Sequence, residues 1–146
     1  FACQSCSCLQ HSQTNSSFTM GIPKGWDSSR AWLEATGFDM FKAFFKAHPE
    51  EQAKFKKFPD CPLAQLHTLP AVRRQALDTM CFLDEMFCGD AVALFDQKVT
   101  DHATWGVYNN DFDKMLDFLP GFFAHAGGDK GEWTAICGKL KASLPH

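Results

Sequence analysis

One histidine has neighbours that suit it to bind a metal or a flat apolar ligand. His102 follows Val92, Phe95 and Val99 at steps of three and four residues, which places all four on one face of a predicted helix. A single histidine on an apolar helix face is more often a buried core residue than a ligand. The turn at residues 105–108 brings further apolar surface beside the imidazole. This segment therefore combines one imidazole with an apolar wall.

A second aromatic wall is predicted earlier in the chain. His48 and Pro49 form a corner, because proline lacks an N–H donor and disfavours helix in the residue before it. Phe55 and Phe58 follow this corner. Two phenylalanines in such a place either fill the core or line a ligand site, and the spacing alone leaves both interpretations open.

The seven cysteines are the other group of residues whose side chains could bind a metal or react. An odd number cannot all pair within one chain, so at least one cysteine is free or joins another chain. The run Cys3, Cys6 and Cys8, with His11 as a fourth ligand, matches zinc chemistry weakly, because a terminus offers little to hold a tetrahedral site. A free thiol at Cys81 or Cys88 could instead bind sulfide or bridge to another chain.

Length and charge narrow the classes of function. The 146 residues carry a net charge of −3 and are 45% apolar, which predicts one domain at 25–146 after a cysteine-rich N-terminal extension at 1–24. No apolar run is long enough to span a bilayer, and no excess of basic residues favours nucleic acid, so we expect neither partner. The crowded cysteines and the start at Phe1 predict a secreted chain, with a cytoplasmic location as the alternative.

The composition predicts an all-α fold. The chain has 15 Phe but only four Val and two Ile, so the β-branched residues that strands favour are scarce. Apolar periodicity, capping residues and glycines indicate successive helices. We expect them at about 27–47, at a short turn from Pro49, at 60–88 with a bend at Pro70, at 90–106, at 110–127 with a bend at Pro120, and at 129–145.

Three segments together resemble the globin family. The string FFKAHPEEQAKFKKF (44–58) resembles the globin helix corner, and DHATWGVYNNDF (101–112) resembles the segment that carries the proximal histidine. The string GGDKGEWTAICGKL (127–140) is similar to the last helix of lucinid clam haemoglobins. The resemblance implies a globin fold of six to eight helices around one haem b.

The resemblance also implies roles for individual residues. His102 would be the proximal ligand of the haem iron, and Phe55 would stack on the haem. Phe41, seven residues before His48, would face bound ligand. The further haem contacts implied by the same alignment are Val72, Val99, Val107, Phe112 and Phe58.

The distal side allows two registers. Counting back from the loop after 83–85 places Val72 over the haem and Thr68 toward the ligand, whereas a shift of one residue gives His67 with Ala71. A distal histidine donates a hydrogen bond to bound oxygen, and threonine is a shorter donor. We favour His67 as the distal residue, with Thr68 as its rival.

The function implied by the resemblance is reversible binding of molecular oxygen and other diatomic ligands, for transport or storage and not as an enzyme. The alternatives are a haem peroxidase or nitric-oxide dioxygenase, a sulfide-binding globin, and a disulfide-linked structural subunit of an extracellular assembly. A more distant resemblance to extracellular annelid haemoglobin chains implies a disulfide from Cys3, Cys6 or Cys8 to Cys137. A homo- or hetero-oligomer, with or without disulfide links between chains, is compatible with this interpretation.

Overall fold

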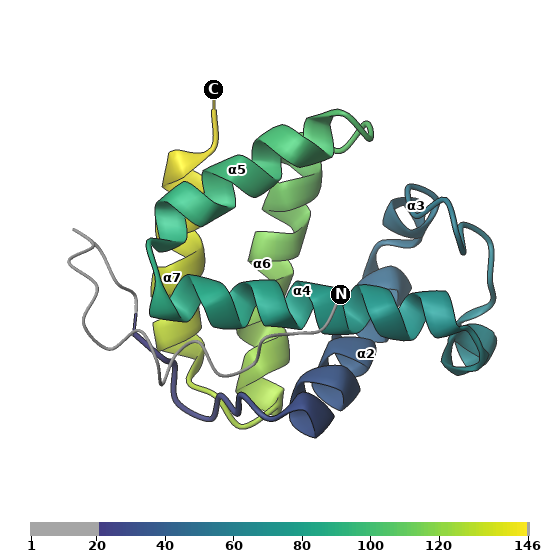
Figure 1. The fold of residues 1–146 in the computed structure, drawn as a ribbon, viewed down its shortest axis with the longest axis horizontal. Coiled ribbons are helices and arrows are strands. Elements are labelled where there is room, and N and C mark those ends of the chain that lie inside the picture. The colour runs from purple at the N-terminus through teal and green to yellow at the C-terminus, as the bar shows by residue number, and fades with distance from the viewer. Residues whose placement is uncertain (1–20, 146) are drawn as a thin grey trace. The chain divides into compact units, whose positions relative to one another are not determined.

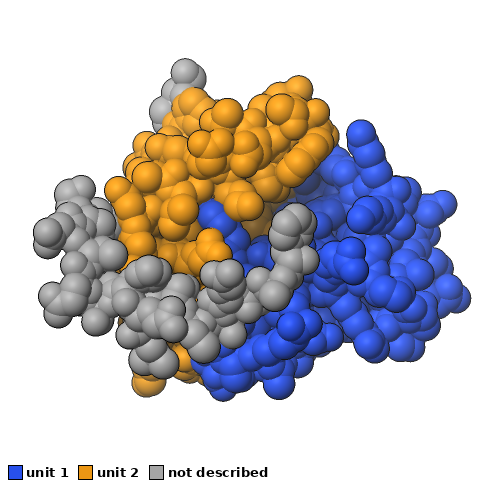
Figure 2. Space-filling view, viewed as in Figure 1, with its two compact units in different colours: residues 1–5, 27–82 blue, residues 6–26, 83–146 orange. Residues whose placement is uncertain are grey.

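The computed structural model describes residues 21–145, and every regular element in that range is helical (Figure 1). The elements are α2 (Arg30–Ala47), α3 (Pro49–Gln52), the 3-10 helix η1 (Leu63–Thr68), α4 (Pro70–Cys88), α5 (Ala91–Ala103), α6 (Asn109–His125) and α7 (Lys130–Ser143). The predicted all-α fold of six to eight helices is confirmed for this part of the chain. The described residues form two compact units, 27–82 (unit 1) and 21–26 with 83–145 (unit 2), coloured separately in Figure 2.

Unit 1 is built on α2. Ser29 caps this helix by accepting a hydrogen bond from the backbone N–H of Trp32 at 3.4 Å. The buried face of α2 carries Leu33, Gly37, Met40, Phe41, Phe44 and Phe45, and the helix packs against α3 and η1. His48 leaves the helical conformation (φ −133°, ψ 73°) immediately before Pro49, so the predicted corner is confirmed.

The predicted continuous helix over 60–88 is wrong. The chain instead forms η1, passes through Leu69 in an extended conformation (φ −100°, ψ 117°) and starts α4 at Pro70. Proline restricts the residue before it to extended backbone, and its missing N–H costs nothing at the first helical position. Pro70 therefore begins a helix where the sequence pattern predicted a bend within one.

Unit 2 contains three helices that pack on one another. Helices α6 and α7 lie side by side, and α5 packs against α7 (Figure 1). Asp90 caps α5 by accepting from the Ala93 N–H at 3.1 Å, and Asp129 caps α7 by accepting from the Glu132 N–H at 2.8 Å. Helix α6 starts one residue earlier than expected, because Asp111 Oδ2 accepts a hydrogen bond from the N–H of Tyr108 at 2.8 Å.

An aromatic cluster forms the core of unit 2. Trp133 stacks on Phe123 with ring centroids 4.0 Å apart, and Trp26 meets Phe87 edge to face at 4.9 Å. The indole Nε1–H of Trp26 donates to Oδ1 of the buried Asp84 at 2.8 Å. Trp26 is therefore a packing residue of the segment that precedes α2.

The described cysteines correct two expectations. Cys137 is a buried free thiol on α7, so the disulfide expected between the N-terminal cysteines and Cys137 is not formed. Cys61 is the other free thiol of residues 21–145. Cys81 and Cys88 on α4 are each disulfide-bonded, so the free thiol that a sulfide-binding role would need is absent at both positions. Cys3, Cys6, Cys8 and His11 lie outside the described residues.

Gly37 generates a prediction about packing within unit 1. A Cβ atom at Gly37 would lie 2.6 Å from Met80 Cγ and 2.8 Å from the carbonyl oxygen of Ala76, so α2 and α4 approach closely there. We expect Gly37→Ala to lower the free energy of unfolding by about 1–3 kcal/mol through overpacking. The matched control is Gly138→Ala in α7, where nothing lies within 4 Å. It should stabilise by about 0.5–1 kcal/mol, because alanine favours helix. Equal effects in urea unfolding would contradict the prediction.

The two free thiols generate a prediction about reactivity. Burial raises the pKa of the Cys137 thiol to about 12, and the charge of Asp117 adds to the shift. At pH 8 about one Cys137 in ten thousand is then thiolate, the reactive form. We expect iodoacetamide to label the half-buried Cys61 in the native protein while Cys137 reacts only in denaturant, as read by peptide mass spectrometry. Equally fast native labelling of Cys137 would contradict this burial.

Candidate functional site

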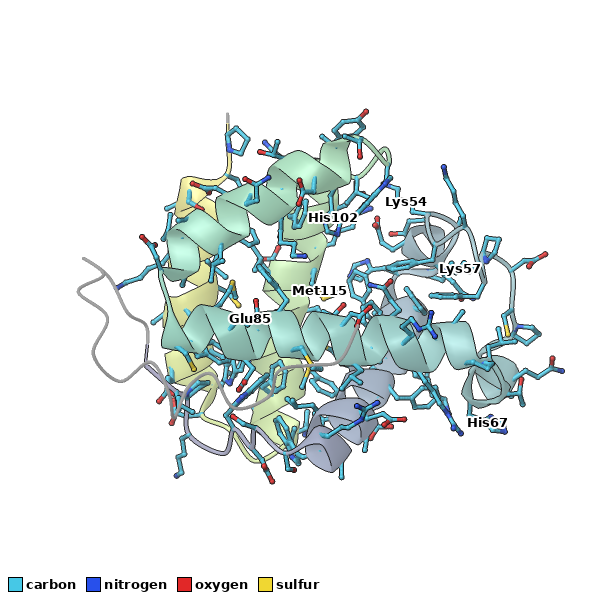
Figure 3. All side chains as sticks on the ribbon, in the orientation of Figure 1. Lys54, Lys57, His67, Glu85, His102 and Met115 are labelled. Atoms are coloured by element: carbon cyan, nitrogen blue, oxygen red, sulfur yellow. The ribbon has the colours of Figure 1, made fainter. Side chains whose placement is uncertain are left out.

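His102 lies in the last turn of α5, with its imidazole half-buried (Figure 3). Its Nδ1 is 2.7 Å from the backbone carbonyl oxygen of Lys98, one helical turn earlier. A carbonyl oxygen can only accept, so Nδ1 carries the proton and donates it. The neutral ring then has its lone pair on Nε2, the nitrogen at the outer end of the side chain. This is the tautomer that binds a metal ion through Nε2.

The surroundings of His102 favour the neutral ring. The pKa of His102 lies below its ordinary value, because partial burial removes water from the charged form and the Lys98 ammonium adds repulsion. The hydrogen bond to the Lys98 carbonyl and the charge of Asp101 act in the opposite direction but are smaller in sum. A neutral imidazole is the form that coordinates iron.

The turn after α5 holds the imidazole in place. The carbonyl of His102 accepts hydrogen bonds from the N–H groups of Trp105 at 2.9 Å and Val107 at 3.1 Å. Trp105 and Phe112 meet the imidazole edge to face, with ring centroids at 5.0 and 5.3 Å. Val99, one of the expected haem contacts, is buried on the same helix. The structure thus brings Val99, Val107 and Phe112 to the same part of unit 2 as His102.

The aromatic wall expected around Phe55 is present in unit 1. Phe55 stacks on Phe58 with centroids 5.3 Å apart and planes 16° apart. It also meets Phe41 at 5.7 Å and Phe45 at 5.2 Å, both edge to face. Phe41, Phe45 and Phe58 are buried and Phe55 is half-buried. Phe41, Phe55 and Phe58 therefore form one cluster within unit 1.

Neither distal candidate points into the protein. His67 and Thr68 belong to η1 and both are exposed; Figure 3 shows His67 on the outside of that element. The hydroxyl of Thr68 donates to the carbonyl of Gln65 at 2.7 Å, which satisfies it locally. The interruption at Leu69 separates these residues from α4. The structure therefore gives no support to His67 or Thr68 as the distal residue.

Helix α4 offers other polar side chains near Val72. Val72 and Ala76 are buried, and Gln75 and Thr79 are half-buried on the same face. The Gln75 Nε2 donates to Thr79 Oγ1 at 3.2 Å. The sequence interpretation missed both residues, although their spacing of three and seven from Val72 was visible.

The described residues contain neither a cluster of metal-binding side chains nor a membrane-spanning helix. Across residues 21–145, no three or more His, Cys, Asp or Glu side chains gather where they could hold a metal ion. None of the helices described for this range is long and apolar enough to cross a membrane.

Comparison with known proteins agrees with this geometry. The family model named Globin matches residues 38–144. A globin of Dolabella auricularia is 27% identical over 124 residues, covering 82% of this chain and 85% of its own. A myoglobin of Cyprinus carpio is 31% identical over 119 residues, covering 79% and 81%. In fold, the chain is similar to ferric Aplysia limacina myoglobin, with a TM-score of 0.72, 24% identity and coverage of 83% and 89%. The chain belongs to the globin family.

Proposed function

We propose that this globin binds haem b through His102 and binds molecular oxygen reversibly, as a carrier or store. The observation that carries the proposal is the hydrogen bond from His102 Nδ1 to the Lys98 carbonyl, because it leaves Nε2 free to coordinate iron. The relative from Cyprinus carpio that bears the name myoglobin supports the same function. When bound, haem iron supplies the chemistry of reversible oxygen binding.

The residues of this chain have separate tasks in the proposal. His102 would hold the iron of a bound haem through Nε2, and the contacts of its ring with Trp105 and Phe112 restrict rotation of that ring. The half-buried ring of Phe55, backed by the buried ring of Phe41, offers flat and apolar surface from unit 1, which suits a macrocycle. Exclusion of water by these rings would protect the iron of a bound haem from oxidation. The chemistry of these residues, one neutral imidazole and several apolar rings, suits a haem.

In this proposal Gln75 is the residue that would donate a hydrogen bond to oxygen on the distal side, and Thr79 orients its amide. An amide is a hydrogen-bond donor that does not gain or lose a proton near neutral pH. It can stabilise bound oxygen but cannot shuttle the proton that peroxide cleavage requires. This chemistry favours an oxygen carrier over a haem peroxidase. The secreted location and any disulfide-linked assembly stay predictions from the sequence.

The role of His102 predicts the result of its removal. We expect His102→Gly to weaken haem binding on the order of 100-fold or more, since it removes the only protein bond to iron in the proposal. Added imidazole should restore a Soret band of wild-type position by replacing the missing ring. The matched control is the exposed His67, whose replacement by alanine should leave the spectrum unchanged. A normal spectrum in His102→Gly without imidazole would refute the assignment.

The distal assignment predicts a change in oxygen dissociation. We expect Gln75→Leu to release oxygen about tenfold faster, the effect of one hydrogen bond worth about 1.4 kcal/mol. The control is Gln65→Leu, which makes the same change at an exposed position of η1. Stopped-flow displacement of oxygen by carbon monoxide measures both rates. If Gln65→Leu has the larger effect, the distal donor lies on η1 after all.

A further inference from the structure

A buried glutamine connects the short helix α3 to the loop that follows it. Gln52 is the last residue of α3 and is 7% exposed. Its Nε2 donates to the carbonyl oxygens of Phe58, at 2.9 Å, and Cys61, at 2.8 Å. Its own backbone carbonyl accepts from the N–H of Phe55 at 3.0 Å. One residue is thus bonded to the loop at three points, spaced three residues apart.

This loop has little other regular structure to hold it. Residues 53–62 lie between α3 and η1 and form turns. Three basic side chains, Lys54, Lys56 and Lys57, are exposed along it, and Figure 3 labels two of them. Charged side chains in water add little to the order of a loop. Buried hydrogen bonds contribute more, because a broken one leaves a polar group without water or partner.

The three bonds bear directly on the position of Phe55. Phe58 is held at its carbonyl by Gln52 and at its N–H by the Phe55 carbonyl, 3.1 Å away. Phe55 stacks on Phe58 and leans on Phe45. The backbone on both sides of the Phe55 ring is therefore fixed through Gln52, while the ring itself stays half-buried and accessible on one side.

We propose that Gln52 is a positioning residue for Phe55, which it holds ready to stack on a bound haem by tying down the loop at 53–61. The inference rests on the proposed haem-binding function for its effect, although the clamp itself belongs to the protein alone. Its consequence is kinetic. A loop that is already ordered loses little entropy when a ligand binds, and a ring that cannot swing away slows the departure of that ligand.

The experiment replaces Gln52 by Met, which keeps the length of the side chain and removes the amide, and by Glu, which keeps the shape and loses both donors. The first readout is hydrogen exchange of the amides at 53–61 in the protein without haem, where both variants should exchange at least tenfold faster. The second is transfer of haemin to excess apomyoglobin, where loss should be on the order of tenfold faster. Gln65→Met, the same change at an exposed position of η1, should alter neither.

The controls separate the clamp from general destabilisation and from the proposed function. Trp26→Phe removes another N–H donor, the one to the buried Asp84, in unit 2 and outside the loop. If it speeds haemin loss as much as Gln52→Met at matched stability, the positioning role is overturned. Unchanged exchange at 53–61 in the Gln52 variants overturns the clamp. If the wild-type protein does not bind haemin, the proposed function fails while the exchange readout still tests the clamp.

Discussion

The 2.7 Å hydrogen bond between His102 Nδ1 and the Lys98 carbonyl is the contact on which the proposed site depends. It exists only because residues 98 and 102 are one turn apart in a regular helix near its end. A carbonyl oxygen has two lone pairs, so the Lys98 carbonyl can accept from a side chain as well as from its helical partner. Three features hold α5 and its end in place: the Asp90 cap, the buried face of the helix and the turn at 104–107. They thereby keep the Lys98 carbonyl within reach of Nδ1 and fix the tautomer of His102.

In both units a side-chain N–H that donates to a backbone carbonyl helps to fix the position of an aromatic ring. In unit 2 it fixes His102, and in unit 1 the amide of Gln52 fixes the loop on which Phe55 stands. Aromatic contacts complete each arrangement, with Phe112 against His102 and Phe58 against Phe55. Rings have few rotatable bonds, so fixing the backbone leaves little freedom to the side chain. Order in each group of residues thus comes from a few polar contacts and not from packing alone.

Local and periodic features were the ones that the sequence could reveal. The position of His102 on one helix with Val92, Phe95 and Val99 was predictable from helical periodicity, and the corner at Pro49 follows from the chemistry of proline. Asp90 and Asp129 cap their helices for an equally local reason. The free Cys137 was not predictable, because pairing depends on which thiols meet in space. Its expected disulfide came from a resemblance to other chains and not from a physical property of the residues around it.

The distal side shows where a one-dimensional pattern stops being informative. Proline at position 70 is compatible with a bend inside a helix and with the first turn of a new one, and the neighbouring residues favour neither strongly. The choice decides whether His67 and Thr68 lie on the same helix as Ala71 and Val72 or belong to a separate element. In the structure Leu69 is extended, so the face of Val72 continues to Gln75 and Thr79 instead. A single backbone conformation thereby places an amide and a hydroxyl, and not an imidazole, on the face of α4 that Val72 begins.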